Sequence, residues 1–581
     1  MKYFLLFCFV INLTAAAFPQ DWETKFEKSD SLETPRYKET MDYFRQFTEY
    51  TDCAKMFSFG TSPQGRDLNC LIISKDKAFT PEEAKKAGKP VILIINGIHS
   101  GEIEGKDACM LLLKEILVTK EKQHCLDDVI LMVVPIFSVD AHERWSKYNR
   151  INQNGPEEMG WRTTSHRLNL NRDWVKGDAP EMQAMLKLFS TWLPDFFVDT
   201  HTTDGADYQY SLTYGMDTHN NIYNELADFN KNKFIPFLKN FAESRGFLVA
   251  PYITFKTWQE GFEGGLTEGV ATPRYSNCYA SAQNRPGLLV ETHMLKPYKE
   301  RVMATKAALE TVVEFCSANS SDLMKLNKRA DENMMKYYAL EKHFLPVAYD
   351  LSDKMVIEKI KGKAYTKTYS DISGTTKITY YDRDTILDVP VYRDAFITDS
   401  VQAPKYYLIP QEWKLLVDRL ALHGIKYSRL DKDEKLEVTR YSFLNVKYDD
   451  HSTEGRQRVN FDVKSYKETV VVPAGTYKVE TAQRTIALIL HMLEPKAGDS
   501  FVKWGFMNTI FETNEYFENY VMEKISAEML ESDPELKKEF EDKLASDEAF
   551  RNSPDARLNF FYQRSPYFDK QYRVYPVMRV E

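Results

Sequence analysis

Three histidines in this sequence are followed, three residues later, by a glutamate, a spacing that lets one imidazole and one carboxylate bind the same metal ion. With eleven histidines in the chain, about one such pair is expected by chance, so the surrounding sequence must discriminate between them. His451 lies in a polar run typical of an exposed loop, and His491 lies in an apolar helical stretch, so we interpret both as structural. His99 instead follows the apolar run 91–95 on a turn bounded by glycines, where α/β sheets place their ligands.

A second histidine completes a set of metal ligands with His99 and Glu102. His201 follows another apolar run, residues 196–198. Two neutral imidazoles and one carboxylate leave a fourth position on zinc for water, which is typical of a catalytic site. Zinc lowers the pKa of that water and polarises a carbonyl group. The sequence therefore predicts one zinc ion per chain on His99, Glu102 and His201.

A third apolar run, residues 286–290, leads directly into Glu291. A carboxylate in such a place is costly unless it is paired or functional, and zinc hydrolysis needs a base that takes the proton of the water. We therefore predict that Glu291 is the general base. For His293, two residues further on, a supporting role behind the site and a plain surface role remain equally open.

Arginine and asparagine gather in residues 160–174. Asn171 followed by Arg172 suits a free carboxylate, because a guanidinium group donates two parallel hydrogen bonds to it. Arg162 suits the stabilisation of a negative oxygen in a tetrahedral intermediate. An arginine-rich loop is usually only solvated, so this interpretation depends on the metal site beside it.

Composition excludes several other classes of protein. The 581 residues carry a formal charge of −9, and Lys and Arg are spread along the chain without a basic run, which argues against nucleic-acid binding. A content of 43% hydrophobic residues is enough for a large core, and the length predicts two or more domains. The chain has no G-x-S-x-G motif and no cysteine in a nucleophile context, so a serine or cysteine hydrolase is disfavoured.

The first residues have the pattern of a secretory signal peptide. Lys2 precedes an apolar run that ends at Leu13, and the small residues Ala15–Ala17 follow. The run is too short to span a bilayer, and no later segment is long and apolar enough to do so. We predict that residues 1–17 are a signal peptide and that the protein is exported, to the periplasm or outside the cell. The remaining six cysteines form no disulfide framework, although one or two disulfides stay open.

Residues 60–295 alternate apolar strand-like runs with amphipathic helical stretches. Short continuous apolar runs indicate strands that are covered on both faces, so we predict an α/β domain with a mixed, mainly parallel central sheet flanked by helices. The clearest strands are 91–95, 129–134, 196–198 and 288–290, and the clearest helices are 104–119 and 180–192.

The pattern changes after about residue 325. A helical stretch over 325–342 is followed by short strand-like runs rich in Tyr, Thr and Val, and 505–550 is again helical in character. Residues 406–410 followed by 411–423 indicate a strand and then a helix. We predict a catalytic domain over 18–325 and a separate α+β domain over 340–581.

Taken together, these residues resemble the zinc carboxypeptidase family typified by carboxypeptidase A. The resemblance covers roughly residues 50–300, and five motifs occur in the family's order. The region after 340 resembles the long C-terminal extensions of bacterial secreted members. The resemblance implies His99, Glu102 and His201 as zinc ligands, Arg162 as the group that polarises the scissile carbonyl, Asn171 and Arg172 as the binders of the terminal carboxylate, and Glu291 as the general base.

The sequence departs from the family pattern in three ways. The family's Asn-Pro-Asp-Gly turn is replaced by the run 135–141, and the spacing between Arg162 and Asn171 is shorter than in digestive members. The family's substrate-capping tyrosine has no unambiguous counterpart, and of Tyr275 and Tyr279 we favour Tyr275. By resemblance, residues 260–280 line the specificity pocket, but no charge there plainly selects a side chain.

The resemblance implies a peptide substrate with a free C-terminal carboxylate, whose last peptide bond is hydrolysed. Two alternatives remain: an amidohydrolase, deacylase or peptidoglycan-trimming enzyme that uses the same zinc site, and a catalytically silent periplasmic binding protein. The presence of all three ligands, the base and both arginines argues against the silent protein. Side-chain specificity, exo- or endopeptidase action, disulfide pairing and oligomeric state stay open.

Overall fold

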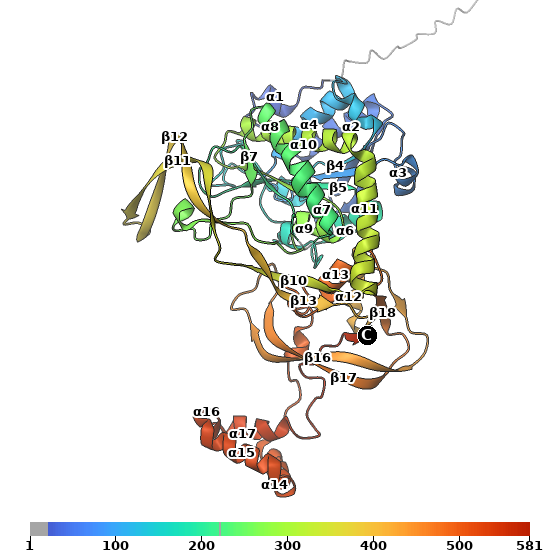
Figure 1. Ribbon diagram of the computed structural model, residues 1–581, viewed down its shortest axis with the longest axis vertical. Coiled ribbons are helices and arrows are strands. Elements are labelled where there is room, and N and C mark those ends of the chain that lie inside the picture. Colours follow the sequence, from blue (N-terminus) through green and yellow to red (C-terminus); the bar gives the residue numbers. More distant parts are fainter. Residues whose placement is uncertain (1–20, 220–221) are drawn as a thin grey trace, which may run out of the picture.

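The computed structural model describes residues 21–219 and 222–581, and within them the main element is an eight-stranded sheet (Figure 1). The four central strands β4, β3, β5 and β9 run parallel, whereas β2 and β6 pair antiparallel at either side of them. The order across the sheet is β1 (Ala54–Thr61), β2 (Asp67–Ile73), β4 (Ile130–Val134), β3 (Val91–Ile95), β5 (Phe196–Thr203), β9 (Gly287–His293), β6 (Leu212–Gly215) and β7 (Val249–Pro251).

The central strands are apolar on both faces because helices cover both faces of the sheet. In β3, Leu93 and Ile95 belong to one hydrophobic cluster, and Ile92 and Ile94 belong to another. This is the alternation that a pleated strand imposes on its side chains. The predicted α/β class with a mixed, mainly parallel sheet is therefore confirmed.

Two groups of helices cover the sheet (Figure 1). The face of Ile92 packs against α2 (Tyr37–Tyr50), α4 (Glu104–Leu113), α7 (Asn224–Phe229), α8 (Ile235–Ser244), α10 (Tyr298–Ala318) and α11 (Ser320–Met334). The hydrophobic cluster on the face of Leu93 includes α6 (Pro180–Trp192) and α9 (Ser276–Ala282). The same cluster continues into the C-terminal region, where α12 (Lys414–Leu422) contacts α6 and α13 (Ile486–Leu493) contacts β10. Three short helices occur along the same part of the chain: α1 (Lys25–Lys28) before α2, α3 (Pro81–Ala87) between β2 and β3, and α5 (Val139–Glu143) after β4.

The predicted helix over 180–192 has the bounds of α6, whose first residue is a proline. Proline suits this position because the first turn of a helix leaves its N–H groups without partners inside the helix. The predicted helix over 104–119 is α4 followed by a π-helical turn, Lys114–Val118.

The C-terminal region is built from strands and a few helices. β10 (Phe344–Leu351) pairs with β13 (Ala395–Gln402), and the long hairpin of β11 (Val356–Ser370) and β12 (Thr375–Tyr392) pairs with β8 (Leu266–Thr267) of the preceding region. The last sheet has the order β15 (Ser428–Arg429), β18 (Tyr477–Glu480), β14 (Tyr406–Ile409), β19 (Met578–Val580), β16 (Glu434–Tyr448) and β17 (Val459–Val472).

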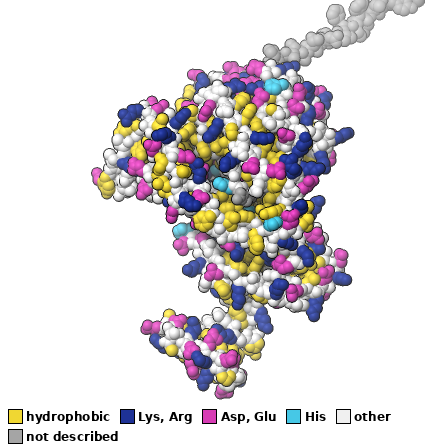
Figure 2. Space-filling model, viewed as in Figure 1, with side chains coloured by type: hydrophobic (Ala, Val, Ile, Leu, Met, Phe, Trp, Pro, Cys, Tyr) yellow, Lys and Arg dark blue, Asp and Glu magenta, His cyan; other side chains and the backbone are white. Residues whose placement is uncertain are grey.

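The predicted strand over 406–410 is β14, and the helix predicted after it is a short 3-10 turn, Gln411–Trp413, followed by α12. The helical prediction for 505–550 was only partly right, because residues 512–518 form no helix. The helices there are α14 (Asn519–Ser532), α15 (Pro534–Ser546) and α16 (Glu548–Arg551), and α17 (Pro554–Tyr562) follows. These four helices enclose their own small core, and Figure 2 shows them set apart from the body on a narrow neck.

The N-terminal prediction of a signal peptide falls outside the described residues. Among the residues that are described, no helix is long and apolar enough to cross a membrane. The six cysteines in the described ranges all carry free thiols, so the disulfides left open by the sequence do not form there. The division at residues 325–340 remains a prediction, since one hydrophobic cluster contains residues from both sides of it.

Candidate active site

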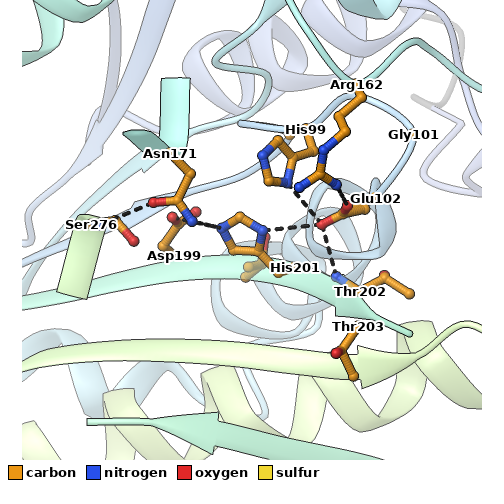
Figure 3. Close-up of polar contacts among 12 residues, drawn as sticks. His99, Gly101, Glu102, Arg162, Asn171, Asp199, His201, Thr202, Thr203 and Ser276 are labelled. Carbon is orange, nitrogen blue, oxygen red and sulfur yellow. Dashed lines mark hydrogen bonds and ion pairs between the residues drawn. The ribbon is translucent and has the colours of Figure 1, made fainter. Parts of the chain in front are cut away.

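The three predicted zinc ligands, which Figure 3 shows together, and the predicted base lie on or directly after the neighbouring parallel strands β3, β5 and β9. His99 and Glu102 lie in the loop that follows β3. His201 lies in β5 and is in register with Glu291 of β9. Because parallel strands end at the same edge of a sheet, the topology brings these side chains together from distant parts of the chain.

The ligand atoms of the three predicted zinc ligands lie within 4.8 Å of one another. His99 Nδ1 is 3.2 Å and His201 Nδ1 is 3.0 Å from the same oxygen, Glu102 Oε2. All three residues are 3% exposed. Figure 3 shows both rings and the carboxylate turned toward one point.

The other ring nitrogen of each histidine already has a partner. His99 Nε2 lies 2.9 Å from Asn169 Oδ1, and His201 Nε2 lies 2.8 Å from Asp199 Oδ2. An acceptor on Nε2 fixes the tautomer and leaves the lone pair of Nδ1 available to a metal. The set of donors, two imidazole nitrogens and a carboxylate, fits zinc with room for a further ligand.

The second oxygen of Glu102 is held by two arginines. Arg150 Nη2 lies 2.9 Å and Arg162 Nη1 lies 3.0 Å from Glu102 Oε1, while the backbone N–H of Thr202 donates to Oε2 at 3.2 Å. Burial raises the pKa of Glu102, but His99 and Arg150 outweigh burial and hold that pKa well below its usual range. Glu102 is therefore an anion at neutral pH, the form that a metal requires.

Burial and neighbouring charges shift the pKa values of His201 and Glu291. Burial lowers the pKa of His201, but the Asp199 and Glu102 carboxylates outweigh it and raise that pKa well above its ordinary value. Burial raises the pKa of Glu291 to about 8, and the carboxylates of Glu102 and Asp199 add to this effect. A bound divalent cation would act against both shifts, because its charge favours a neutral imidazole and an ionised carboxylate.

Asn171, Arg172 and Tyr275 lie next to this group. Asn171 Nδ2 is 3.4 Å from His201 Nε2, and Asn171 Oδ1 accepts a hydrogen bond from the backbone N–H of Ser276 at 3.1 Å. The Arg172 guanidinium stacks on the Tyr275 ring with its central carbon 4.4 Å from the ring centre. These residues line a single cleft of about 810 Å³ together with Arg162, Glu291 and the three predicted zinc ligands.

The chain is similar to known zinc carboxypeptidases. Residues 40–234 match the sequence model of the family described as zinc carboxypeptidase. Over these residues the chain is therefore similar to a zinc carboxypeptidase domain. The cofactor of this family is zinc, for which the buried group of two histidines and a glutamate is suited, and the enzyme is a metal-dependent hydrolase.

Curated relatives extend the similarity beyond this domain. Carboxypeptidase 2 of Trichophyton equinum is 22% identical over 506 residues, which covers 82% of this chain and 85% of the relative. Carboxypeptidase 2 of Trichophyton rubrum is 20% identical over 515 residues, covering 85% of this chain and 88% of the relative. Among solved structures, a metallo-carboxypeptidase from Burkholderia cenocepacia superposes with a TM-score of 0.37 at 15% identity, covering 49% of this chain and 70% of that one.

Three residues that were not predicted from the sequence contact the predicted zinc ligands: Arg150, Asn169 and Asp199. Asp199 precedes His201 by two residues in β5, so the two side chains lie on the same face of the strand, and this alternation could have identified Asp199 from the sequence. Asn169 lies in an irregular loop, and its contact with His99 depends on how that loop folds. Arg150 lies in a polar segment without periodicity, so no local signal marked it. His293 is buried rather than on the surface, and its ring lies 4.3 Å from that of Tyr208.

Another group of metal-binding side chains occurs among the described residues, namely His124, Cys125 and Glu314. The His124 side chain is 59% exposed, and Lys122 Nζ already lies 3.3 Å from Glu314 Oε1. An ammonium group beside the carboxylate opposes a metal cation at that place. The buried group around Glu102 is therefore the better candidate.

Proposed function

We propose that this protein removes C-terminal residues from peptides, with Glu291 as the general base. The observation that supports this most directly is the position of Asn171 and Arg172 in the same cleft as His99, Glu102 and His201. An arginine next to the metal group provides a place for a carboxylate, and a free carboxylate marks the end of a peptide chain. The peptide bond adjacent to that carboxylate is then held near the metal.

Zinc, when bound on His99, Glu102 and His201, supplies Lewis-acid chemistry that activates water and polarises a carbonyl group. The Arg172 guanidinium binds the terminal carboxylate of the substrate, and Asn171 assists it. A carboxylate oxygen of Glu291 accepts the proton of the attacking water and later donates it to the nitrogen of the leaving amine.

Arg162 is suited to the negative oxygen that develops on the scissile carbonyl. Its side chain is 43% exposed, so its guanidinium is accessible from the cleft even while it pairs with Glu102. A donor placed where charge develops contributes about 10²–10³-fold to the rate of acyl transfer. Tyr275, stacked on Arg172, is suited to cover the bound C-terminal residue.

The variant Glu291→Gln tests the role of the base. We expect kcat on a blocked dipeptide to fall by about 10²–10⁴-fold, because the amide cannot accept the proton, while one zinc per chain is retained. Glu468→Gln is a matched control, because the same change is made at a carboxylate outside the cleft, whose Oε1 lies 2.9 Å from Arg440 Nη1. Near-normal turnover in Glu291→Gln would refute the assignment.

The choice of substrate decides between C-terminal peptide hydrolysis and the two related activities. An N-acyl amino acid and a peptidoglycan peptide also carry a free carboxylate that Arg172 could bind. We expect the release of C-terminal residues from ordinary blocked dipeptides and slower reaction with the other two. Turnover of N-acyl amino acids or muropeptides alone would replace the proposal with that activity.

We also propose that the protein is exported, because the sequence of residues 1–17 has the charge and apolar pattern of a signal peptide. Mass spectrometry of the mature N-terminus, after expression in a secreting host, tests this. A protein that starts at Met1 inside the cell would contradict it.

A further inference from the structure

The C-terminal region contacts the two segments that carry the substrate-anchoring residues. One segment, residues 161–179, contains Asn169, Asn171 and Arg172, and its regular structure is limited to a 3-10 turn, Leu170–Arg172. The other segment, residues 267–276, leads into Tyr275 and also lacks long regular elements. Loops of this kind hold catalytic side chains in place only where other parts of the molecule fix them.

The first contact comes from the turn 449–458, which joins β16 to β17. A carboxylate oxygen of Glu454 accepts a hydrogen bond from the backbone N–H of Asn169 at 3.2 Å. Asn169 Oδ1 in turn lies 2.9 Å from His99 Nε2. A side chain of the C-terminal region is therefore two hydrogen bonds away from the metal-binding ring of His99.

The turn 449–458 also binds the C-terminal end of segment 161–179. Arg456 forms a two-pronged ion pair with Asp178, with Nη2 2.6 Å from Oδ1 and Nε 2.8 Å from Oδ2. The guanidinium also stacks on the ring of Phe506, 3.5 Å from its centre. Between these contacts the turn 449–458 lies close to segment 161–179, since a Cβ on Gly455 would be 3.1 Å from a methyl of Leu168. Paired guanidinium and carboxylate groups of this geometry fix both position and orientation.

The second segment is held by Asp499. Its oxygens accept hydrogen bonds from the backbone N–H of Arg274 at 3.0 Å and from the Arg274 Nε at 2.6 Å. The Asp499 side chain is fully buried, and the Arg274 guanidinium stacks on Trp504 of the same region. Arg274 is followed directly by Tyr275, whose ring stacks on Arg172.

The two segments also hold each other. The backbone N–H of Ser276 donates to Asn171 Oδ1 at 3.1 Å, which orients the amide of Asn171 toward His201 (Figure 3). Glu454 and Asp499 thus support the two sides of one hydrogen-bonded unit. A displacement of about 1 Å in such a unit can cost 10²-fold in rate.

We propose that the C-terminal region is a working part of the active site, in which Glu454 positions the metal-binding ring of His99 through Asn169, and Asp499 positions the carboxylate-binding residues Asn171 and Arg172 through Arg274. The part that concerns the carboxylate rests on the proposed function, whereas the part that concerns the metal does not. Glu454 and Asp499 are positioning residues, since neither contacts the substrate.

The metal arm of the test measures zinc affinity in the full-length protein, by competition with a chelator. We expect Glu454→Ala to raise the zinc dissociation constant about tenfold, because outer partners of a histidine ligand typically change affinity by 10–100-fold. Glu454→Gln keeps an oxygen that accepts from Asn169 N–H and should restore affinity to within about threefold of wild type. Glu468→Ala is the control, because it removes an ion pair with Arg440 inside the same region, 2.9 Å long.

The substrate arm measures the binding of a free amino acid, a product of the proposed reaction that carries a free carboxylate, together with KM and kcat. We expect Asp499→Ala to raise the dissociation constant and KM about tenfold and to change kcat less than about threefold, because anchoring is weakened while the base and metal ligands are untouched. Zinc affinity should not change in this variant. Asp499→Asn keeps an acceptor for Arg274 N–H and should lie between Asp499→Ala and wild type.

Three results would overturn the inference. Zinc affinity in Glu454→Ala within twofold of wild type overturns the metal arm, and unchanged ligand binding in Asp499→Ala overturns the substrate arm. Equal losses in Glu468→Ala overturn both, because they would show general destabilisation. If the wild-type protein binds zinc but cleaves no peptide, the proposed function fails while the zinc measurement on Glu454→Ala still decides the metal arm.

Discussion

We predict that the protein loses stability in mild acid, because the C-terminal region buries His423 against Val175 and Tyr279 of the preceding region. His423 is fully buried, its Nε2 donates to the backbone oxygen of Val175 at 3.1 Å, and its Nδ1 accepts from the Tyr279 hydroxyl at 3.0 Å. Burial lowers the pKa of His423 from 6.5 to about 4, and the charge of Arg419 adds to the effect. The folded protein therefore keeps this ring neutral in a pH range where the unfolded chain protonates it.

The magnitude follows from the two pKa values. Because the folded pKa is depressed, the contribution of His423 to stability is present above pH 6.5 and is lost as the pH falls toward 4. The full loss is about 3 kcal/mol, at 1.36 kcal/mol for each pKa unit, and about 2 kcal/mol of it falls between pH 7 and pH 5.

Urea unfolding at pH 7 and pH 5 measures this loss in wild type and in His423→Gln. The glutamine side chain can donate to Val175 and accept from Tyr279 but does not titrate, so we expect the first unfolding transition of the variant to lose about 2 kcal/mol less on acidification. The exposed residue His166 provides the control His166→Gln, which should behave as wild type. An equal pH dependence in His423→Gln and wild type would refute the argument.

Two further substitutions test the surroundings of the predicted zinc ligands. Asp199→Ala removes the carboxylate 2.8 Å from His201 Nε2, and we expect chelator competition to show a 10–100-fold weaker zinc affinity; unchanged affinity would contradict this. Gly105→Ala places a Cβ 2.0 Å from Thr200 Oγ1 and 2.3 Å from Asn96 Oδ1. We therefore expect thermal unfolding to show a destabilisation of about 1–3 kcal/mol. An unaltered melting temperature would contradict this, because it would show that α4 can shift at no cost.

The sequence predicted the central strands well, because each of them is a continuous apolar run that the folded protein buries on both faces. The runs 91–95, 129–134 and 196–198 are continuous and apolar because helices cover both faces of their sheet, so they could be identified without knowledge of the fold. Parallel pairing then places the residues after these strands at one edge, which is why His99 and His201 could be expected to meet.

Partners from distant segments could not be predicted in the same way. The contact of Arg150 with Glu102 and that of Asn169 with His99 depend on how irregular loops fold over the sheet edge, and loops carry no periodic signal. The long hairpin of β11 and β12 alternates polar and apolar residues only weakly because much of it is exposed. The non-helical segment 512–518 was predicted as helix because its composition resembles that of the helices that follow.

Zinc content measured in parallel with peptide hydrolysis tests the central claim most directly. We expect one zinc per chain and chelator-sensitive release of C-terminal residues in the wild-type protein, and neither zinc nor release in His201→Ala, because the remaining two ligands no longer enclose the metal. One zinc per chain retained in His201→Ala, with hydrolysis intact, would show that the metal and the chemistry lie elsewhere and would contradict the account.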